Sequence, residues 1–267
     1  MSKKNIAYST NTISDYYASN RRSWRELYPS ERHMFEAIAA RGANFSSVLD
    51  VGCAAGGLGE ALMERFRTLA SYTGVDVHRE AIASAVTLPS RIPGKREFIA
   101  ADICHSPQLA GRTFDIVTAL GVADFNVDSD GILAKCWEHV RPGGRLVISL
   151  RLTPGEGISD VEQSYQYIWF DRELPPPPDA ERAPYTVFNI DSAIGWLSRQ
   201  VPTPDLIQLY GYWGKPSPTA HTCYDRLVFS VIAMRKPAPD DVVQEPLIEA
   251  ELPAGIFMSS PASRCTS

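Results

Sequence analysis

The sequence predicts an α/β fold built on a doubly wound, mostly parallel sheet. Short apolar stretches typical of strands alternate with stretches in which apolar residues recur at helical spacing. A glycine-rich turn at 52–59 follows the first of these strands and leads into a helix. Aspartates stand at the ends of three successive strands. Strands joined through helices lie parallel, and such sheets bind ligands at the edge where the carboxyl ends of the strands meet.

Two helices are predicted ahead of the first strand. Residues 12–27 can form one helix, in which aromatic residues are interspersed with arginines. The second begins clearly at Pro29 and ends at Gly42. We expect residues 1–45 to form a helical lid segment over the sheet edge. The alternative is a segment that packs against the sheet and exposes an arginine-rich face.

Five strands with their connecting helices are predicted next. The expected strands are 47–51, 72–76, 97–101, 114–119 and 145–150. The expected helices are 57–67, 79–88 and 129–140. Two further stretches, 206–212 and 227–234, are rich in residues that favour strands and are separated by a loop of Gly, Pro and Ser. The main domain is therefore expected to span residues 46–236.

An insert at about 152–190 separates the fifth strand from the next helix. It contains two extended, aromatic-rich segments joined by four consecutive prolines at 175–178, which favour a stiff linker. We expect the insert to complete the lid. Beyond residue 236 the chain becomes acidic and Pro-rich, so residues 237–267 are predicted to be a disordered tail.

The charge distribution argues against a nucleic-acid partner. The net charge is −5, and residues 237–267 carry five acids and one base, which leaves the body near −1 with no basic run. No apolar run is long enough for a membrane span, and no secretory signal begins the chain. The five cysteines lack metal-site spacing, so we expect no metal, reduced thiols and a cytoplasmic protein.

The stretch Asp50-Val51-Gly52-Cys53-Ala54-Ala55-Gly56 resembles the first motif of class I methyltransferases, which use S-adenosylmethionine (SAM). A dinucleotide fingerprint would need a glycine where Ala54 stands. Asp76, ending the second strand, and Asp102-Ile103 resemble the second and third motifs. The resemblance spans about residues 47–236. It implies a Rossmann-like seven-stranded sheet in the order 3-2-1-4-5-7-6, with the last strand antiparallel, and SAM as cofactor, converted to S-adenosylhomocysteine.

The resemblance also implies roles for individual residues. Asp76 would accept hydrogen bonds from the ribose hydroxyls of SAM. Asp102 would accept one from the adenine amino group, while Ile103 covers the ring. Asp50 would orient the glycine-rich turn or meet the amino group of SAM through water. The complete set of implied cofactor-binding residues is Asp50, Gly52, Ala54, Gly56, Asp76, Val77, Asp102 and Ile103.

Methyl transfer needs an aligned acceptor and a base for its proton. Asp124, after the fourth strand, is the first candidate to touch the acceptor. His221 is the candidate base, because an imidazole titrates near neutrality. A solvent-exposed loop histidine is the alternative. Aromatic residues in the lid segments suit stacking on an acceptor, although they suit a hydrophobic lid core equally well. The expected substrate-binding residues are Tyr16, Tyr17, Tyr212 and Trp213.

The acceptor class is inferred by elimination. Asp124-Phe125-Asn126 does not match the D/N-P-P-Y/F motif of DNA amino-methyltransferases, and no basic patch suggests RNA or DNA. The sequence therefore predicts methyl transfer to a hydroxyl of a small polar acceptor, such as a sugar or secondary metabolite. N-methylation of an amine or amino sugar is the competing hypothesis in the same class. A non-catalytic SAM-binding protein and an NAD-dependent enzyme are the hypotheses from different classes.

Overall fold

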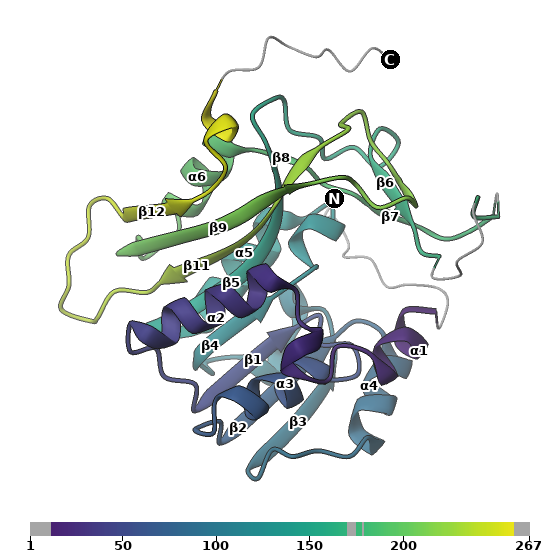
Figure 1. The fold of residues 1–267 in the computed structure, drawn as a ribbon. Helices are drawn as coiled ribbons and strands as arrows, with labels where there is room; N and C mark the ends of the chain where they lie inside the picture. The colour runs from purple at the N-terminus through teal and green to yellow at the C-terminus, as the bar shows by residue number, and fades with distance from the viewer. Residues whose placement is uncertain (1–11, 170–174, 178, 259–267) are drawn as a thin grey trace.

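The computed structural model describes residues 12–169, 175–177 and 179–258 (Figure 1). Its main feature is a nine-stranded sheet in the order β12-β9-β11-β5-β4-β1-β2-β3, with the short β8 paired to β5. The strands of this sheet are β1 (Ser47–Val51), β2 (Ser71–Asp76), β3 (Lys95–Ala100), β4 (Phe114–Ala119), β5 (Val140–Thr153), β8 (Phe188–Asn189), β9 (Leu206–Gly214), β11 (Leu227–Arg235) and β12 (Leu247–Glu251).

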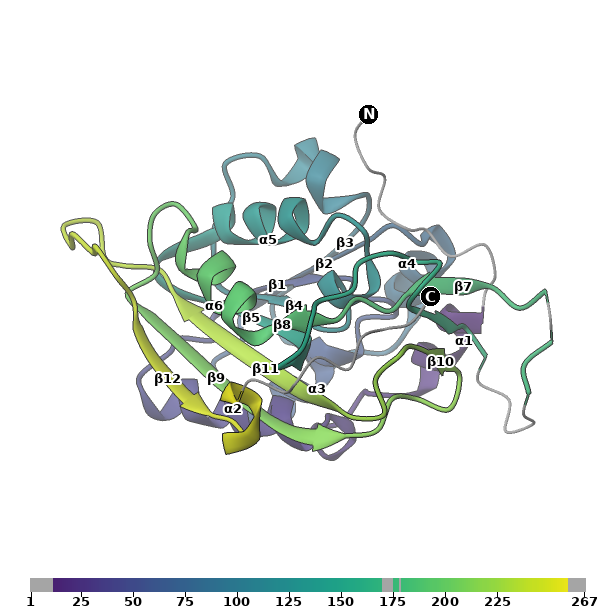
Figure 2. The same cartoon turned by 90° about the horizontal axis from the view of Figure 1, so that it is seen from above.

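Helices cover both faces of this sheet. The α-helices are α1 (Thr12–Ser19), α2 (Pro29–Ala40), α3 (Gly57–Arg65), α4 (Arg79–Thr87), α5 (Ser129–Glu138) and α6 (Ile190–Ser198). Figure 2 shows α2 and α3 on one face and α5 and α6 on the other. The short 3₁₀ helices are η1 (Trp24–Glu26), η2 (Ile103–His105), η3 (Pro107–Leu109), η4 (Ala123–Phe125) and η5 (Ala254–Phe257).

Burial on both faces explains why the strands read as continuous apolar runs. In β1, Val48 belongs to the core beneath α2 and α3, and its neighbour Leu49 belongs to the core beneath α5 and α6. Both side chains are fully buried. Successive strand residues point to opposite faces, so a strand covered on both sides needs apolar residues at every position. Asp50 is the exception in β1, and its burial is part of the site described below.

The predicted strand order is confirmed for the seven expected strands. β11 runs antiparallel between β5 and β9, and β1, β2, β3, β4 and β5 pair in parallel. The predicted helix over 12–27 is wrong, because the chain forms α1 and then η1. Arg21 interrupts the helix with a φ of +59°, and Ser23 is extended. Together, α1 and η1 are called the N-terminal segment (12–28) below.

The prediction of a disordered tail is wrong for Leu247–Glu251. These residues form β12, an eighth main strand that pairs in parallel with β9. Glu249 lies 2.8 Å from the Arg41 guanidinium that follows α2, so part of the tail's negative charge is paired with the body of the protein. Ile256 follows as a fully buried core residue. The local composition of residues 237–267 could not reveal these contacts, because the partners lie far away in sequence. The domain boundaries at 45 and 236 stay predictions.

The insert and the connection between β9 and β11 together form a small second sheet beyond the end of β5 (Figure 1). β6 (Tyr165–Tyr167) pairs antiparallel with both β7 (Arg182–Pro184) and β10 (Ala220–His221). We call this three-stranded sheet the cap. β6 lies in the first predicted extended segment (165–170), whereas the second (185–188) contributes only Phe188, to β8 of the main sheet. Part of the predicted proline linker, Pro178, lies outside the described residues. That the cap is a lid stays a prediction.

Two sequence expectations concern the cell environment. No helix among the described residues combines the length and apolarity that crossing a membrane requires. Cys53, Cys104 and Cys136 are free thiols, as expected. The expectation of reduced thiols is wrong for Cys223, which is disulfide-bonded.

Candidate functional site

The turn between β1 and α3 has a backbone that favours glycine. Gly52, Ala54 and Gly56 have φ values of +72°, +45° and +74°, in the left-handed region. A Cβ at Gly52 would overlap Cγ2 of Val122, and one at Gly56 would lie 2.7 Å from the Phe98 ring. The two glycines therefore let this turn pack directly against β3 and against the segment that follows β4.

Asp76 joins this turn to the turn that follows β2. Its Oδ2 accepts a hydrogen bond from the Ala54 N–H at 2.8 Å, and its Oδ1 accepts one from the His78 N–H at 2.8 Å. Burial raises the pKa of Asp76, and the two hydrogen bonds oppose that shift. A carboxylate oxygen can accept more than one hydrogen bond, so Asp76 retains capacity for two ribose hydroxyls.

Asp50 lies inside the sheet, only 4% exposed. Its Oδ2 accepts a hydrogen bond from Tyr72 at 2.5 Å, and its Oδ1 accepts one from Thr118 at 2.7 Å. Burial raises the pKa of Asp50 to about 6, against the lowering effect of these hydrogen bonds. Both partners come from neighbouring strands. Of the two expected roles, these contacts favour orienting the end of β1.

Asp102 follows β3 at the same edge. It begins η2 by accepting a hydrogen bond from the Cys104 N–H at 2.9 Å, and the intervening Ile103 is buried. The Ala101 N–H also donates to the carbonyl of Asp76, which fixes the ends of β2 and β3 side by side. Three aspartates thus stand at the carboxyl ends of three adjacent strands, as the sequence predicts. Val77, the residue after Asp76, is partly buried.

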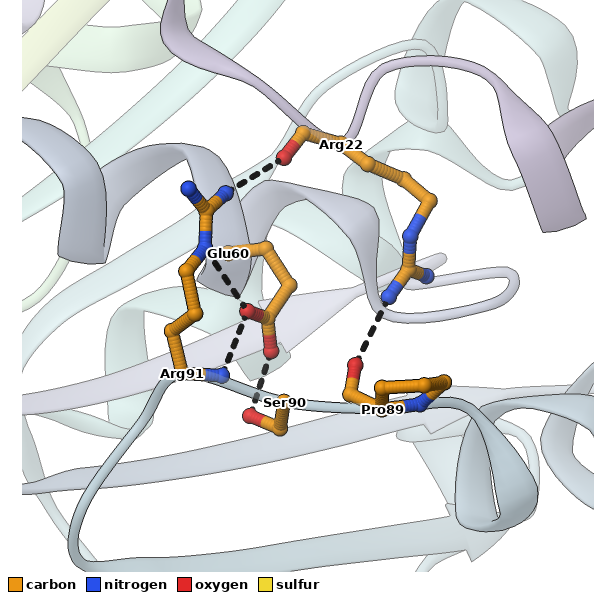
Figure 3. Close-up of a pocket in the computed structure, with 5 residues that line it drawn as sticks. All are labelled: Arg22, Glu60, Pro89, Ser90 and Arg91. Atoms are coloured by element: carbon orange, nitrogen blue, oxygen red, sulfur yellow. Dashed lines mark hydrogen bonds and ion pairs between the residues drawn. The ribbon is translucent and has the colours of Figure 1, made fainter.

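The N-terminal segment is hydrogen-bonded to the loop that follows α4. Figure 3 shows Arg22, which donates to the carbonyl of Pro89 at 3.0 Å and accepts from Arg91 at 3.2 Å. Glu60 of α3 is buried and accepts from the Arg91 N–H and from Ser90. These five residues line a cavity of about 240 Å³. Because their polar groups already bond one another, we assign them to holding the segment in place.

Three of the four predicted aromatic residues gather near this segment. The Tyr16 and Tyr17 rings meet edge to face at 5.0 Å, and burial raises the pKa of Tyr17 to about 12. Tyr16 and Tyr212 are both close enough to Tyr28 to raise its pKa, after the larger effect of burial. Trp213 belongs to a different environment: it points to the opposite face of β9, where Arg226 lies 4.0 Å above its ring.

Asp124 lies in η4, after β4, and is 4% exposed. Its Oδ2 lies 3.4 Å from Nη1 of Arg151, a buried residue of β5. The same Nη1 donates to the Asp124 carbonyl at 2.6 Å. Burial raises the pKa of Asp124, and Arg151 opposes that shift. Arg151 was not predicted from the sequence, although a charged residue inside a strand buried on both faces is an informative signal.

The structure does not place His221 in contact with the Asp124–Arg151 ion pair. His221 lies on β10 of the cap, is exposed, and stacks on the Tyr165 ring at 4.9 Å. Asp124 is buried with Arg151 beneath the cap. His221 is therefore exposed, as in the alternative interpretation of the sequence. Its role as the base stays a prediction.

Comparisons with known proteins match the part of the chain that contains the glycine-rich turn and the three strand-end aspartates. A family model described as a methyltransferase domain matches residues 49–146. The ubiquinone biosynthesis O-methyltransferase of Pseudomonas entomophila is 32% identical over 104 residues, covering 38% of this chain and 43% of that protein. The Mesorhizobium japonicum protein of that name is 30% identical over 139 residues, covering 50% and 53%. The chain thus matches only about half the length of these relatives.

A solved structure extends the likeness in fold. The N-methyltransferase NodS from Bradyrhizobium japonicum, in complex with S-adenosyl-l-homocysteine, is similar with a TM-score of 0.50 and 16% identity. The likeness covers 85% of this chain and 100% of that one. At this identity it shows a shared fold. It confirms the predicted fold class. The matched methyltransferase domain supports the family resemblance drawn from the motifs.

Proposed function

Because this chain contains a class I SAM-dependent methyltransferase domain, we propose that it transfers the methyl group of SAM to a hydroxyl of a small polar acceptor. The observation that carries the proposal is Asp76, whose two oxygens fasten Ala54 and His78 together at the carboxyl edge of the sheet. This arrangement holds a partly exposed carboxylate beside a glycine-rich turn, which is the chemistry that a ribose requires. The location that we propose is cytoplasmic.

The residues of the first half fit SAM in donor and acceptor type. Gly52, Ala54 and Gly56 would present backbone to the methionine and ribose portions. Asp76 and Val77 would hold the ribose, and the remaining cofactor residues would be Asp50, Asp102 and Ile103. When bound, SAM would supply a methyl group activated by a sulfonium. The protein's own contribution is to hold the acceptor in line with that methyl group and to receive its proton.

Asp124 is the better placed of the two candidate bases. Gly52 of the cofactor turn packs against Val122, two residues before Asp124. Asp124 therefore lies two residues from a contact with the turn that would bind SAM, whereas His221 lies on β10 of the cap. The relatives that part of this chain resembles are O-methyltransferases, which supports oxygen as the acceptor atom.

The test is methyl transfer from isotope-labelled SAM to a panel of small alcohols, phenols and amines, followed by mass spectrometry. We expect labelled ethers, and we expect Asp124→Asn to lower kcat by about 10²–10⁴-fold, as removal of a general base does. His221→Gln in the same assay compares the two candidate bases directly. Labelled amines alone would establish N-methylation instead. SAM binding without any transfer would support a non-catalytic SAM-binding protein.

A further inference from the structure

Three buried polar atoms beneath the cap make no hydrogen bond of normal geometry with a described residue: Oδ1 of Asp124, Nε of Arg151 and the hydroxyl of Tyr185, which lies beside the Arg151 guanidinium. Their residues are 4%, 4% and 1% exposed. Leaving a buried polar group unpaired is unfavourable, so such atoms are rare in folded proteins. Three of them in one cluster, contributed by η4, β5 and the segment between β7 and β8, require an explanation.

The cluster is rigidly built around Arg151. Its guanidinium lies 3.9 Å from the centre of the Phe125 ring and 3.7 Å from that of Tyr185, so it is held between two aromatic faces. Its Nη1 is occupied by the carbonyl and carboxylate of Asp124. This leaves the Nε–H of Arg151 as a donor and Oδ1 of Asp124 as an acceptor. Val122, two residues before Asp124, contacts Gly52 of the cofactor turn and links that turn to the cluster along the chain.

We propose that Asp124, Arg151 and Tyr185 form the subsite that receives the acceptor's hydroxyl and rejects charged groups of the same shape. The inference rests on the proposed methyltransferase function. A hydroxyl donates one hydrogen bond and accepts others, so it can satisfy Oδ1 of Asp124 and a neighbouring donor together. An ammonium group can donate to Asp124, but it cannot accept from Arg151, which repels it and keeps an unpaired N–H. A carboxylate can accept from Arg151, but it cannot donate to Asp124, which repels it and keeps an unpaired oxygen.

The same geometry assigns the atoms of the reaction. The acceptor oxygen forms a bond to the methyl carbon, and the carbon–sulfur bond breaks with its electron pair remaining on sulfur, giving S-adenosylhomocysteine. The hydroxyl proton passes to Oδ1 of Asp124. Asp124 is thus the catalytic base, while Arg151 and Tyr185 hold the oxygen as charge develops on it.

Entry to the subsite requires movement of the cap. The Thr186 N–H donates to the carbonyl of Asp124, and the Tyr185 N–H donates to the carbonyl of Ser164 ahead of β6. These two hydrogen bonds hold the segment that covers the three unpartnered atoms. An acceptor reaches them when this segment lifts, and its hydroxyl then supplies the contacts that the closed form lacks.

The test uses the full chain saturated with S-adenosylhomocysteine and three probes of one shape: benzyl alcohol, benzylamine and benzoate. At neutral pH they carry a neutral hydroxyl, a cation and an anion. Ligand-observed NMR titration measures their dissociation constants. We expect benzyl alcohol to bind most tightly, and Tyr185→Phe to weaken it about 5–10-fold through loss of one hydrogen bond. Asp124→Asn should weaken it by a similar factor or more.

Tyr224→Phe is the matched control, because the Tyr224 hydroxyl is already bonded to the carbonyl of Glu156. We expect Tyr224→Phe to lower Tm and leave benzyl alcohol binding unchanged, and Tyr185→Phe to leave Tm unchanged or raise it. Equal or tighter binding of benzylamine or benzoate would overturn the inference. So would benzyl alcohol binding that Tyr185→Phe does not change, or no binding to a chain that holds S-adenosylhomocysteine. Failure to bind S-adenosylhomocysteine would instead overturn the proposed function.

Discussion

The two halves of the site differ in how completely their polar groups are paired. At the ends of β1, β2 and β3, the aspartates already accept hydrogen bonds from backbone amides or neighbouring hydroxyls. Beneath the cap, Asp124, Arg151 and Tyr185 each retain an unpartnered atom. Under the roles that we propose, the half that would bind SAM is already paired, while the half that would bind the acceptor keeps polar atoms that a ligand could pair. The matched methyltransferase domain, 49–146, contains the first half and ends before Arg151.

The largest effect that we predict is the loss of Arg151. Arg151→Met removes the counter-charge of Asp124 in a buried setting, and breaking a buried pair in this way costs about 3–5 kcal/mol. Urea denaturation at pH 7 measures the loss. Lys135→Met breaks the exposed pair with Glu138 and should cost less than about 1 kcal/mol. Similar losses in the two variants would show that the Asp124–Arg151 pair is not a distinct buried unit.

A steric substitution tests the contact between the two halves. Gly52→Ala places a Cβ against Val122 and imposes a left-handed φ, for a combined cost of roughly 2–4 kcal/mol. Gly121→Ala is the matched control, because Gly121 has a φ of +67° but no atom within 4 Å of the added Cβ. Its cost should be about 1–2 kcal/mol, from the backbone alone. Equal denaturation midpoints for the two variants would argue against a tight Gly52–Val122 contact.

Because the Asp50 carboxyl is buried, the free energy of unfolding should depend on pH. The pKa of Asp50 is raised by burial from 3.8 to about 6, so the folded state binds the proton more tightly than the unfolded state. Stability from this group is present below pH 4 and is lost as the pH rises through 6, by up to roughly 3 kcal/mol. In Asp50→Asn that component is absent.

The measurement is the free energy of unfolding of both proteins from pH 4 to pH 7. The Asn variant should gain relative to the natural protein as the pH rises. A difference that stays constant with pH would mean that Asp50 is not buried as a carboxylate.

The smallest predicted effect is on cofactor affinity. Asp76→Asn removes the charge that strengthens hydrogen bonds to ribose hydroxyls, so the Kd for S-adenosylhomocysteine should rise about tenfold, or 1–2 kcal/mol. Calorimetric titration measures it. Asp130→Asn, on the exposed start of α5, is the control and should leave the Kd unchanged. An unchanged Kd in Asp76→Asn would remove Asp76 from the proposed ribose site.

The sequence was sufficient for the features that local patterns encode. The spacing of apolar runs predicted seven strands in the observed order, and Asp50, Asp76 and Asp102 were placed at strand ends by their position after those runs. β12 was missed because its acids are paired with Arg41 and the edge of β9, both far away in sequence. Such pairings follow from the folded sheet and leave no local pattern.

The acceptor half was predicted less completely for the same reason. Asp124 was singled out from its position after the fourth strand, but its partner Arg151 is supplied by β5 and Tyr185 by the insert. Tyr212 and Trp213 were predicted together as aromatic residues of the lid segments, yet they are adjacent residues of β9 and therefore face opposite ways. Adjacency along the chain is therefore a poor guide to which aromatic residues share a pocket.

Thermal unfolding of the full chain, alone and with S-adenosylhomocysteine, SAM or NAD, tests most directly whether the chain binds SAM. A ligand at about a hundred times its Kd stabilises the folded state by roughly 2.7 kcal/mol, which should raise Tm by about 5 °C or more for a chain of this size. We predict this shift with S-adenosylhomocysteine and SAM and none with NAD. A shift with NAD alone, or no shift with either SAM or S-adenosylhomocysteine, would contradict the proposed SAM-dependent function.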